Sequence, residues 1–405
     1  MAKKISLRLD LKVPPAEVFR AFSNATVLRE WLCDVATVNP REGGRAYLWW
    51  DHGSFIAGKF TKFIPNEKLE IRCQGCNEPT PTKISITLVE KDMGTDLELK
   101  ESGFSDDNTG KKLRQKVELR WKHSLENLVS VLENGPDLRV VNRPMLGIYI
   151  GGLDEKIAKK IGVPIEKGIR VEGLVEGMGA VTSGVQKDDV IVAMDGKPTP
   201  DFQSLGKMLQ THKAGDTVET QLYRKNSLKT LWVTLSFRPI PEIPKTAKGL
   251  SETLGRTYNK KFSELIKCFN GINEEMSNSA PKKGEWSACE VLAHLIHAER
   301  GLQNNLHNVC FDQEEVSDGY GDNLDARCKA TVAAYGSSKA LLEEYRRSLK
   351  ETTLLIAGIP AGFVKHKGSY WRQAFNLLAF PPHMDEHIEQ IRAGFETLKK
   401  KAPKK

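Results

Sequence analysis

The hydrophobic pattern of this chain changes along its length, and proline- or glycine-containing segments mark the boundaries. In residues 1–135 and 138–241, apolar and polar residues largely alternate with the two-residue period of β-strands, interrupted by a few helical stretches. In residues 247–400 the pattern is helical throughout. The boundaries are Asn134-Gly135-Pro136-Asp137 and the stretch Pro239 to Pro244, which resists helix and central strand. A chain of 405 residues also exceeds one ordinary core. We therefore expect a multidomain α+β protein with domains at 1–135, 138–241 and 247–400.

Composition narrows the class of protein. The chain is 40% hydrophobic and 28% charged, and it has no apolar run of about 18 residues, so we expect no membrane span. The N-terminus alternates apolar with polar residues instead of supplying the apolar core of a signal peptide. Seven scattered cysteines are typical of reduced thiols, which predicts a cytoplasmic protein. Cys73 and Cys76 form a CxxC that we interpret as a turn after a strand, because no second pair or nearby histidine completes a zinc set.

The positive charge of the chain is concentrated at its C-terminal end. Five lysines supply more than half of the net charge of +8. Such a tail is most often a solvated, frayed end, and no basic stripe interleaves with aromatic residues. We expect no nucleic-acid partner. The five lysines are Lys399, Lys400, Lys401, Lys404 and Lys405.

The first domain begins with a strand and ends with a long helix. Ile5 to Val13 alternates strictly, which predicts a strand with one buried face, and Pro14-Pro15 ends it. A short helix follows and leads to Trp31, and glycine and proline turns then separate several strands. Apolar residues spaced by three or four predict a closing amphipathic helix that covers the sheet. These residues are Val117, Trp121, Leu125, Leu128 and Leu132.

The first domain resembles the START-like, helix-grip superfamily and, within it, the chaperone-ATPase-activator homology group. The resemblance rests on Pro14 to Phe19, Trp31-Leu32, Glu42-Gly43-Gly44-Arg45 and the helix around Trp121. Members enclose a cavity between sheet and helix, so the resemblance implies an apolar small-molecule ligand. The alternative is that side chains fill this space as ordinary core. No polar cluster at a spacing suited to acid–base chemistry is evident.

The second domain is predicted to be a small, partly open β-barrel. Leu146 to Ile150 is a strand entered through a glycine turn, and Gly184 to Lys197 indicates turn, strand and hairpin turn. A short helix is predicted from the spacing of Phe202, Leu205 and Leu209. Two closing strands follow, at residues 218–223 and 231–235.

This region is similar to PDZ domains in the arrangement found in HtrA-type proteases. The Gly-Asp-Val-Ile core of that pattern is Asp188-Asp189-Val190-Ile191 here, which removes a flexible glycine. The resemblance implies that Met145, Leu146, Gly147 and Ile148 form a loop whose amides bind a terminal carboxylate. Leu205 and Leu209 then line a pocket for the last side chain. The expected partners are protein C-terminal peptides with apolar ends; the alternative is a domain used for internal packing. We find no Ser, His and Asp set that would make the chain a protease.

The third domain is predicted to be a bundle of four antiparallel helices. The expected helices are residues 250–276, 287–308, 324–357 and 370–399. Ser287-Ala288-Cys289-Glu290 is a capping box that starts the second one.

Histidines on two of these helices form a candidate metal site. His383 and His387 are four residues apart, so they share one face of the last helix. His294, on the second helix, is expected to reach the edge of the bundle interior. His297 is expected to face water. Three imidazoles hold a divalent ion and leave a coordination position open, whereas the alternative is that each histidine is an ordinary surface or core residue. Pro381-Pro382 is expected to break or kink the helix just before His383.

The third domain resembles the DinB family, which combines one histidine on the second helix with HxxxH on the fourth. The matching segments are Trp286-Ser287, Glu290 to Leu295 and His383 to Ile391. The resemblance implies that His294, His383 and His387 bind a divalent metal ion, zinc or nickel.

Two classes of function remain open. The first is a non-catalytic binding and adaptor protein, which we favour because no catalytic base or nucleophile beyond the metal ligands can be named. The second is an enzyme, since some DinB-like proteins resemble metal-dependent thiol S-transferases or related hydrolases and transferases.

Overall fold

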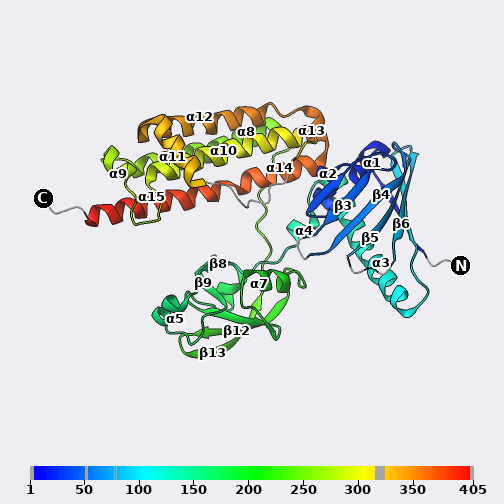
Figure 1. The fold of residues 1–405 in the computed structure, drawn as a ribbon, viewed down its shortest axis with the longest axis horizontal. Helices are drawn as coiled ribbons and strands as arrows, with labels where there is room; N and C mark the ends of the chain where they lie inside the picture. Colours follow the sequence, from blue (N-terminus) through cyan, green and yellow to red (C-terminus); the bar gives the residue numbers. More distant parts are fainter. Residues whose placement is uncertain (1–3, 51–52, 77, 79, 315–323, 402–405) are drawn as a thin grey trace. The chain divides into compact units, whose positions relative to one another are not determined.

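The computed structural model describes residues 4–50, 53–76, 78, 80–314 and 324–401. The chain divides into two compact units, Met1–Gly135 with Pro241–Lys405, and Pro136–Ile240. The first unit contains an N-terminal sheet domain and a C-terminal helical region (Figure 1). None of the described helices is both long and apolar enough to cross a bilayer. Lys404 and Lys405 of the basic tail lie outside the described residues.

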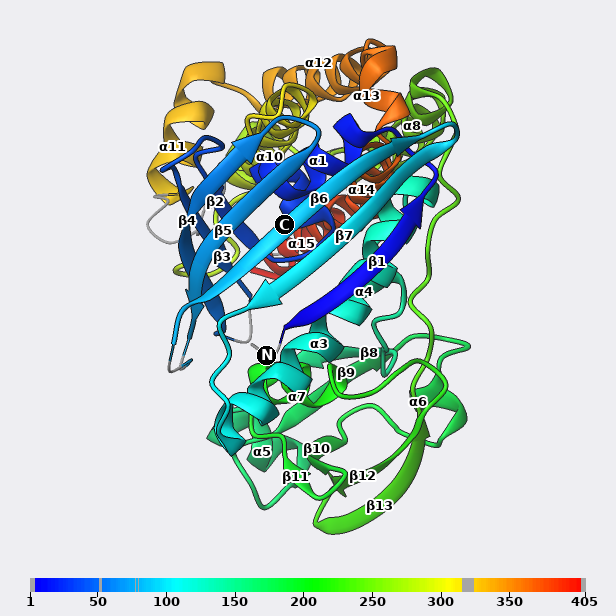
Figure 2. The same cartoon turned by 90° about the vertical axis from the view of Figure 1, so that its right-hand side faces the viewer.

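The N-terminal domain is built on a seven-stranded antiparallel sheet in the order β1-β7-β6-β5-β4-β3-β2 (Figure 2). The predicted strand is confirmed in β1 (Ile5–Leu11), whose Ile5 and Leu11 are buried while Ser6, Arg8 and Asp10 face outward. The other strands are β2 (Val35–Val38), β3 (Arg45–Trp49), β4 (Phe55–Ile64), β5 (Lys68–Gly75), β6 (Thr82–Lys91) and β7 (Gly94–Ser102).

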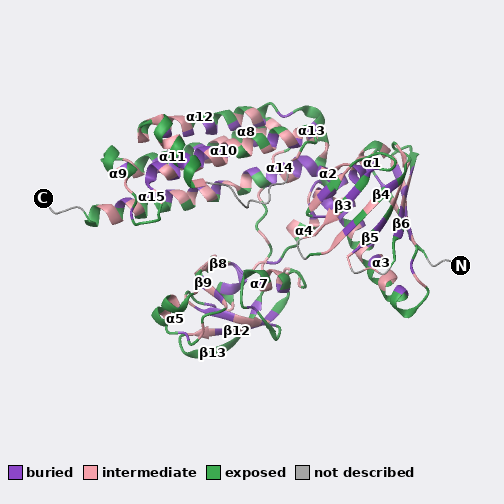
Figure 3. Cartoon of the chain, viewed as in Figure 1, coloured by how far each residue is buried: buried purple, intermediate pink, exposed green. Residues whose placement is uncertain are grey.

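Three helices accompany this sheet. They are α1 (Pro15–Ser23), α2 (Ala25–Trp31) and α3 (Asn108–Val129), and a π-helical turn, Ser130–Asn134, extends α3. Asp107 caps α3 by accepting a hydrogen bond from the Gly110 amide. The predicted apolar face of α3 is buried: Val117, Trp121 and Leu125 belong to the same core as the sheet (Figure 3).

Side chains fill part of the space between α3 and the sheet. Glu101 is 2% exposed and accepts hydrogen bonds from Trp121 Nε1 at 2.6 Å and Thr82 Oγ1 at 2.7 Å. Burial raises the pKa of this carboxyl. Cys73 of the CxxC is buried beside Thr82, and burial raises the pKa of its thiol to about 12, so it is unreactive at neutral pH.

The helical region packs its long helices around one apolar core. Its α10 contacts α11, α12 and α15, and α8 contacts α12 and α15. The helices are α8 (Ala247–Cys268), α9 (Glu274–Asn278), α10 (Ala288–Cys310), α11 (Leu324–Tyr335), α12 (Ser338–Ala357), α13 (Ala361–Lys365), α14 (Lys367–Ala379) and α15 (Pro381–Lys401).

Three of the four predicted helices prove to be interrupted. The segment 250–276 breaks after α8, where Gly271 has a φ of +72°, and Asn273 caps α9. The segment 324–357 breaks at Gly336, also with a φ of +72°, and Ser337 caps α12. The predictions of single helices there were wrong because glycine left-handed turns end them. The last segment breaks between α14 and α15 at Phe380, since Pro381 cannot continue the hydrogen-bond ladder.

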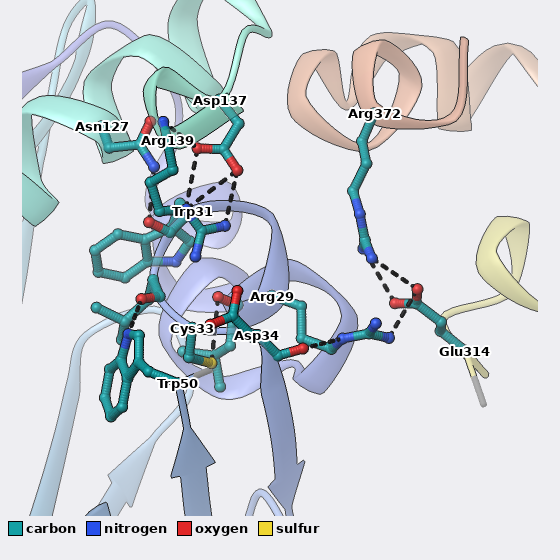
Figure 4. A network of polar contacts seen from close by, with 12 residues as sticks. Arg29, Trp31, Cys33, Asp34, Trp50, Asn127, Asp137, Arg139, Glu314 and Arg372 are labelled. Atoms are coloured by element: carbon teal, nitrogen blue, oxygen red, sulfur yellow. Dashed lines mark hydrogen bonds and ion pairs between the residues drawn. The ribbon is translucent and has the colours of Figure 1, made fainter. Parts of the chain in front are cut away.

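The N-terminal domain and the helical region contact each other within the first unit. Arg29 of α2 forms an ion pair with Glu314 at 2.8 Å, and Arg372 of α14 donates to the same carboxylate (Figure 4). Gly368 at the start of α14 packs on Val131, so close that a side chain there would collide with it. Polar and packing contacts therefore join these two parts of the chain.

The second unit has a six-stranded sheet in the order β13-β12-β10-β9-β8, with β11 paired to β10. Its β8 forms the edge opposite β13. Short helices α4, α5, α6 and α7 connect and cover the strands. The elements are α4 (Leu138–Val141), β8 (Ile148–Gly151), α5 (Glu155–Ile161), β9 (Ile169–Leu174), α6 (Gly179–Thr182), β10 (Val190–Met194), β11 (Lys197–Pro198), α7 (Phe202–Leu209), β12 (Thr217–Arg224) and β13 (Ser227–Thr234).

Candidate functional site

The three predicted histidines converge in the helical region. His294 lies on α10, and His383 and His387 lie on α15. The Nε2 atom of His383 is 3.2 Å from Nε2 of His294 and 3.0 Å from Nε2 of His387. One nitrogen from each ring lies within 4.8 Å of the other two, and all three residues are half-buried. Two helices therefore present three imidazoles to one point.

Local sequence fixes where each histidine falls. Ser287 and Glu290 form the predicted capping box, which sets the start of α10 two turns before His294. Pro381 opens α15, so His383 lies in the first turn, as the two prolines led us to expect. That position disfavours a cation through the helix dipole, yet the His383 ring still meets the other two.

Neighbouring side chains orient the rings. His387 Nδ1 and Gln390 Oε1 are 2.8 Å apart, and because the amide oxygen accepts, the Nδ1–H of His387 donates. This bond leaves the Nε2 lone pair of His387 directed at the cluster. The Trp286 ring contacts the His294 ring, with centroids 5.2 Å apart. Gln390 was missed from the sequence, although its position three residues after His387 was a usable signal.

The cluster is electrostatically suited to a cation. Burial, then the charges of His387 and His383, lower the pKa of His294 to about 4, and burial also lowers the pKa of His383. Both rings are therefore neutral at neutral pH, and their nitrogens carry lone pairs. Two imidazole nitrogens bound to one zinc ion at about 2.1 Å lie roughly 3.0–3.4 Å apart. The observed separations of 3.0 and 3.2 Å fit that donor set.

His297 does not behave as predicted from the helical wheel. Its ring is half-buried, and Nε2 lies 2.8 Å from Thr331 Oγ1 on α11. The expectation that it faces water was wrong because the break at Gly336 lets α11 fold back over this side of α10. His297 pairs with Thr331 and does not belong to the histidine cluster.

All six residues predicted for peptide binding line one groove of the second unit. The groove has a volume of about 310 Å³ and runs between β8 and α7. Leu205 is buried at its base, while Tyr149 and Ile150 of the edge strand are exposed. The predicted residues are Met145, Leu146, Gly147, Ile148, Leu205 and Leu209; Arg143, Pro144, Ile150, Phe202, Gly206 and Arg238 complete the lining.

The loop before β8 turns at Gly147. Gly147 has a φ of +81°, which favours glycine, and a side chain there would collide with Met178. The carbonyls of Leu146 and Gly147 accept from Ala180 and Val175, which holds the loop. Within the described residues, the amides of Leu146 and Gly147 donate to no backbone carbonyl. Two backbone donors are thus available at the end of the groove.

Two arginines at this groove were not predicted. Arg143 and Arg238 come from the two ends of the unit and line the groove beside the loop. Burial, then the charge of Arg143, lower the pKa of Arg238. They add positive charge next to the free amides. No local motif signals this pairing, because the residues are 95 positions apart.

The departure from the PDZ pattern at Asp188 is accommodated. Its φ of +66° lies in the left-handed region, where aspartate is tolerated better than most residues. The Asp188 carboxylate accepts hydrogen bonds from Arg170 at 2.8 and 3.0 Å. The turn therefore keeps the shape that glycine would give it, and β10 starts where the pattern predicts.

Comparisons with known families agree with two of these regions. Residues 12–133 match the family described as "Activator of Hsp90 ATPase homolog 1-like protein", and residues 144–235 match the PDZ domain family. The chain thus contains an AHSA1-type domain, which is START-like, followed by a PDZ domain. Both are binding modules, the first for small molecules or proteins and the second for peptides.

Individual relatives match only part of the chain. The periplasmic pH-dependent serine endoprotease DegQ of Escherichia coli is 29% identical over 99 residues, 24% of this chain and 22% of that protein. A probable periplasmic serine endoprotease DegP-like of Pseudomonas putida is 30% identical over 145 residues, 36% of this chain and 29% of that protein. The chain thus spans less than a third of either relative, and these partial matches do not show a protease domain.

Solved structures resemble about a third of the chain. Protein MLL2253 from Mesorhizobium loti is 21% identical, with a TM-score of 0.31, and the match covers 33% of this chain and 99% of that one. The Aha1 dimer from Colwellia psychrerythraea is 21% identical, with a TM-score of 0.29, and the match covers 33% of this chain and 97% of that one.

Proposed function

We propose that this protein is a non-catalytic adaptor whose PDZ domain captures the C-termini of partner proteins. The open edge of β8 beside an apolar groove, with two free amides at its end, carries this proposal. An extended peptide would add as a further strand next to β8. Its carboxylate would accept from the amides of Leu146 and Gly147, and its last side chain would pack against Leu205 and Leu209.

The adaptor has two further binding elements in the same proposal. The AHSA1-type domain is proposed to bind an apolar small molecule, although the Glu101–Trp121 pair occupies part of its interior. The helical region is proposed to be DinB-like and to hold a divalent ion, zinc or nickel, through His294, His383 and His387. The short nitrogen–nitrogen separations and the neutral rings support this metal site.

A peptide array tests the capture of C-termini. The full chain is exposed to peptides that differ in their last residue, each made with a free carboxylate and as the terminal amide. We expect binding to peptides with an apolar last residue and loss of binding on amidation, because an amide group cannot replace the charged acceptor. Binding that depends neither on the last residue of the peptide nor on its amidation would contradict the proposal.

Metal analysis tests the histidine site. The chain is purified, dialysed against zinc or nickel and analysed for bound metal, beside a variant with His294, His383 and His387 all changed to Ala. A His123→Ala variant is the matched control, since that histidine lies on α3 outside the cluster. We expect one ion per chain, retained in the control and lost in the triple variant. Equal metal content in all three proteins would contradict the site.

A second candidate function is a metal-dependent thiol S-transferase. Three protein ligands leave a coordination position open, where a bound metal would lower the pKa of a thiol and hold it as a thiolate. A pocket of about 340 Å³ lies beside the cluster and is lined by Trp286 and Gln390, which contact His294 and His387. In this reading the chain's own residues orient the ligand rings and enclose an electrophilic substrate.

An activity assay separates the two functions. Purified chain is incubated with zinc, a low-molecular-weight thiol and an electrophilic test substrate. Conjugation that requires zinc and disappears in His387→Ala would support the transferase and end the purely non-catalytic account. Conjugation at the rate of the protein-free control would remove the enzyme candidate.

A cytoplasmic location is also part of the proposal. Cys73, Cys76, Cys268, Cys289 and Cys310 are free, and burial raises the thiol pKa values of Cys73 and Cys289 to about 12. Reduced, unpaired thiols suit a reducing compartment. Fractionation of cells that express the chain, with soluble markers for each compartment, tests this placement; recovery with the oxidising compartment would contradict it.

A further inference from the structure

A pocket that no prediction anticipated lies in the first unit, between the AHSA1-type domain and the start of α14. Its volume is about 330 Å³, at the small end of ligand pockets. The AHSA1-type domain contributes residues from the end of β1, α1, α2 and the π turn, and the helical region contributes residues 365–369. The residues used below are Lys12, Glu17, Arg20, Glu30, Lys365 and His366.

A buried acid lies at this pocket. Glu30 is 2% exposed, and its Oε2 atom accepts a hydrogen bond from Ser369 Oγ at 3.0 Å. Its Oε1 atom is buried and has no hydrogen-bond partner in the described chain. A buried carboxylate oxygen without a donor is costly, so the folded protein gains from any group that supplies one. Burial raises the pKa of Glu30 to about 7, against the opposing charge of Arg372.

The other charged groups of the pocket are mostly basic. Lys12 and Lys365 are exposed, and their ammonium groups have no ion-pair partner within the described residues. The remaining groups already have partners: Arg20 pairs with Asp312, His366 Nδ1 lies 2.8 Å from Glu17 Oε2, and Lys367 Nζ donates to the carbonyl of Glu133. The pocket therefore combines two available cations with one buried acceptor that lacks a donor.

We propose that this pocket binds a small organic anion that also carries a hydroxyl or ammonium group. The anionic group lies against Lys12 and Lys365, and the hydroxyl or ammonium group donates to Oε1 of Glu30. A ligand with only one of these groups satisfies half of the site. Because its lining comes from the AHSA1-type domain and from α13–α14, the ligand contacts both parts of the unit. This site is independent of the peptide groove and of the histidine cluster.

Calorimetric titration of the full chain tests the pocket. The probes are glycerol 3-phosphate, which pairs hydroxyl groups with a phosphate, and L-alanine, which pairs an ammonium with a carboxylate and has no hydroxyl. Inorganic phosphate and glycerol are the probes with one group each. We expect at least one of the two-group probes to bind about tenfold or more tightly than either single-group probe. The preferred probe identifies whether the donor is a hydroxyl or an ammonium group.

Variants locate the binding. Lys365→Met and Lys12→Met are surface changes that leave the fold intact, and Glu30→Gln replaces the acceptor with a group of the same shape. Lys339→Met, an exposed lysine of α12, is the matched control. We expect each of the first three variants to weaken the preferred probe about tenfold and the control to leave it unchanged. Failure of every two-group probe to bind the unaltered chain would overturn the proposal, as would unchanged binding in both pocket-lysine variants.

Discussion

The peptide groove and the histidine cluster reach their chemistry by different means. The groove offers backbone amides from one loop, Leu146 and Gly147, next to an edge strand. The cluster depends on three side chains from α10 and α15, brought within 4.8 Å by helix packing. A backbone site survives most changes of side chain, whereas a side-chain site is lost with any one of its ligands. The predictions below separate the two sites on that basis.

The largest effect is expected from removing the one histidine of α10. His294→Ala leaves the HxxxH pair on α15 but removes the ligand that joins the two helices. Zinc should raise the melting temperature of the unaltered chain and of His123→Ala, because an ion that binds only the folded state stabilises it. It should not stabilise His294→Ala. Equal zinc stabilisation in His294→Ala would show that the helices are not bridged through His294.

A charged residue in the groove should weaken peptide binding without touching metal content. Leu209→Lys places an ammonium group where an apolar last side chain is expected to pack. Loss of that burial is worth about 1.5–3 kcal/mol, which is roughly 10–150-fold in affinity. Leu228→Lys on the exposed face of β13 is the control. Fluorescence polarisation with a peptide of the preferred sequence measures the difference, and equal affinities in the two variants would place the peptide elsewhere.

The orienting partner of His387 should matter less than the ligands. Gln390→Leu removes the acceptor from His387 Nδ1 and leaves all three ligands in place. Loss of such a partner typically weakens metal affinity about 10–100-fold. Competition with a zinc-binding dye measures this, with Gln313→Leu as the control outside the cluster. Metal affinity in Gln390→Leu equal to that of the control would mean that packing alone orients the ring.

The last prediction concerns the stability of the first unit and its dependence on pH. Glu299 in the core of the helical region accepts from Tyr258 at 3.0 Å, and burial raises its pKa from 4.5 to about 7. The folded state therefore holds a proton that the unfolded state releases between about pH 4.5 and 7. Stability falls as pH rises through this window, by on the order of 3 kcal/mol.

A substitution isolates this contribution. Glu299→Gln cannot ionise, so the variant should lose part of the decline in stability between about pH 4.5 and 7 and should exceed the unaltered chain at pH 8. The raised pKa of Glu30 causes a similar fall of stability with rising pH, and Glu30 is still present in the variant. Denaturant unfolding at several pH values measures the change, with Glu351→Gln on the surface of α12 as the control. Parallel pH profiles for the two variants would contradict the assignment.

The sequence predicts sites better where the signal is local. The loop and helix of the PDZ groove follow from one short motif and one helical spacing, and all six expected residues line the groove. His383 and His387 share a face by their spacing of four, and the helical spacing of α10 places His294 at the edge of the bundle interior. The paired strand and helix boundaries of the AHSA1-type domain follow from alternation and from the proline and glycine turns.

The remaining features depend on contacts between distant segments. His297 is covered by α11, and this requires the chain to break at Gly336. The spacing of apolar residues does not reveal such a break, because an interrupted helix and a continuous one have the same spacing. Arg143 and Arg238 line one groove only because the two ends of the unit meet, with Met145 paired to Ser236. Glu30, whose Oε1 atom has no hydrogen-bond donor, lies at a pocket formed by the AHSA1-type domain and the helical region. No local sequence pattern reveals a pocket of this kind.

Amide signals of the PDZ loop test the central claim most directly. The chain is labelled with ¹⁵N, and spectra are recorded with an apolar-ended peptide and with its terminal amide. We predict that the Leu146 and Gly147 amides shift and become protected from exchange with the free-carboxylate peptide only. Unchanged loop amides under saturating peptide, or the same change with both peptides, would contradict capture of a C-terminus at this site.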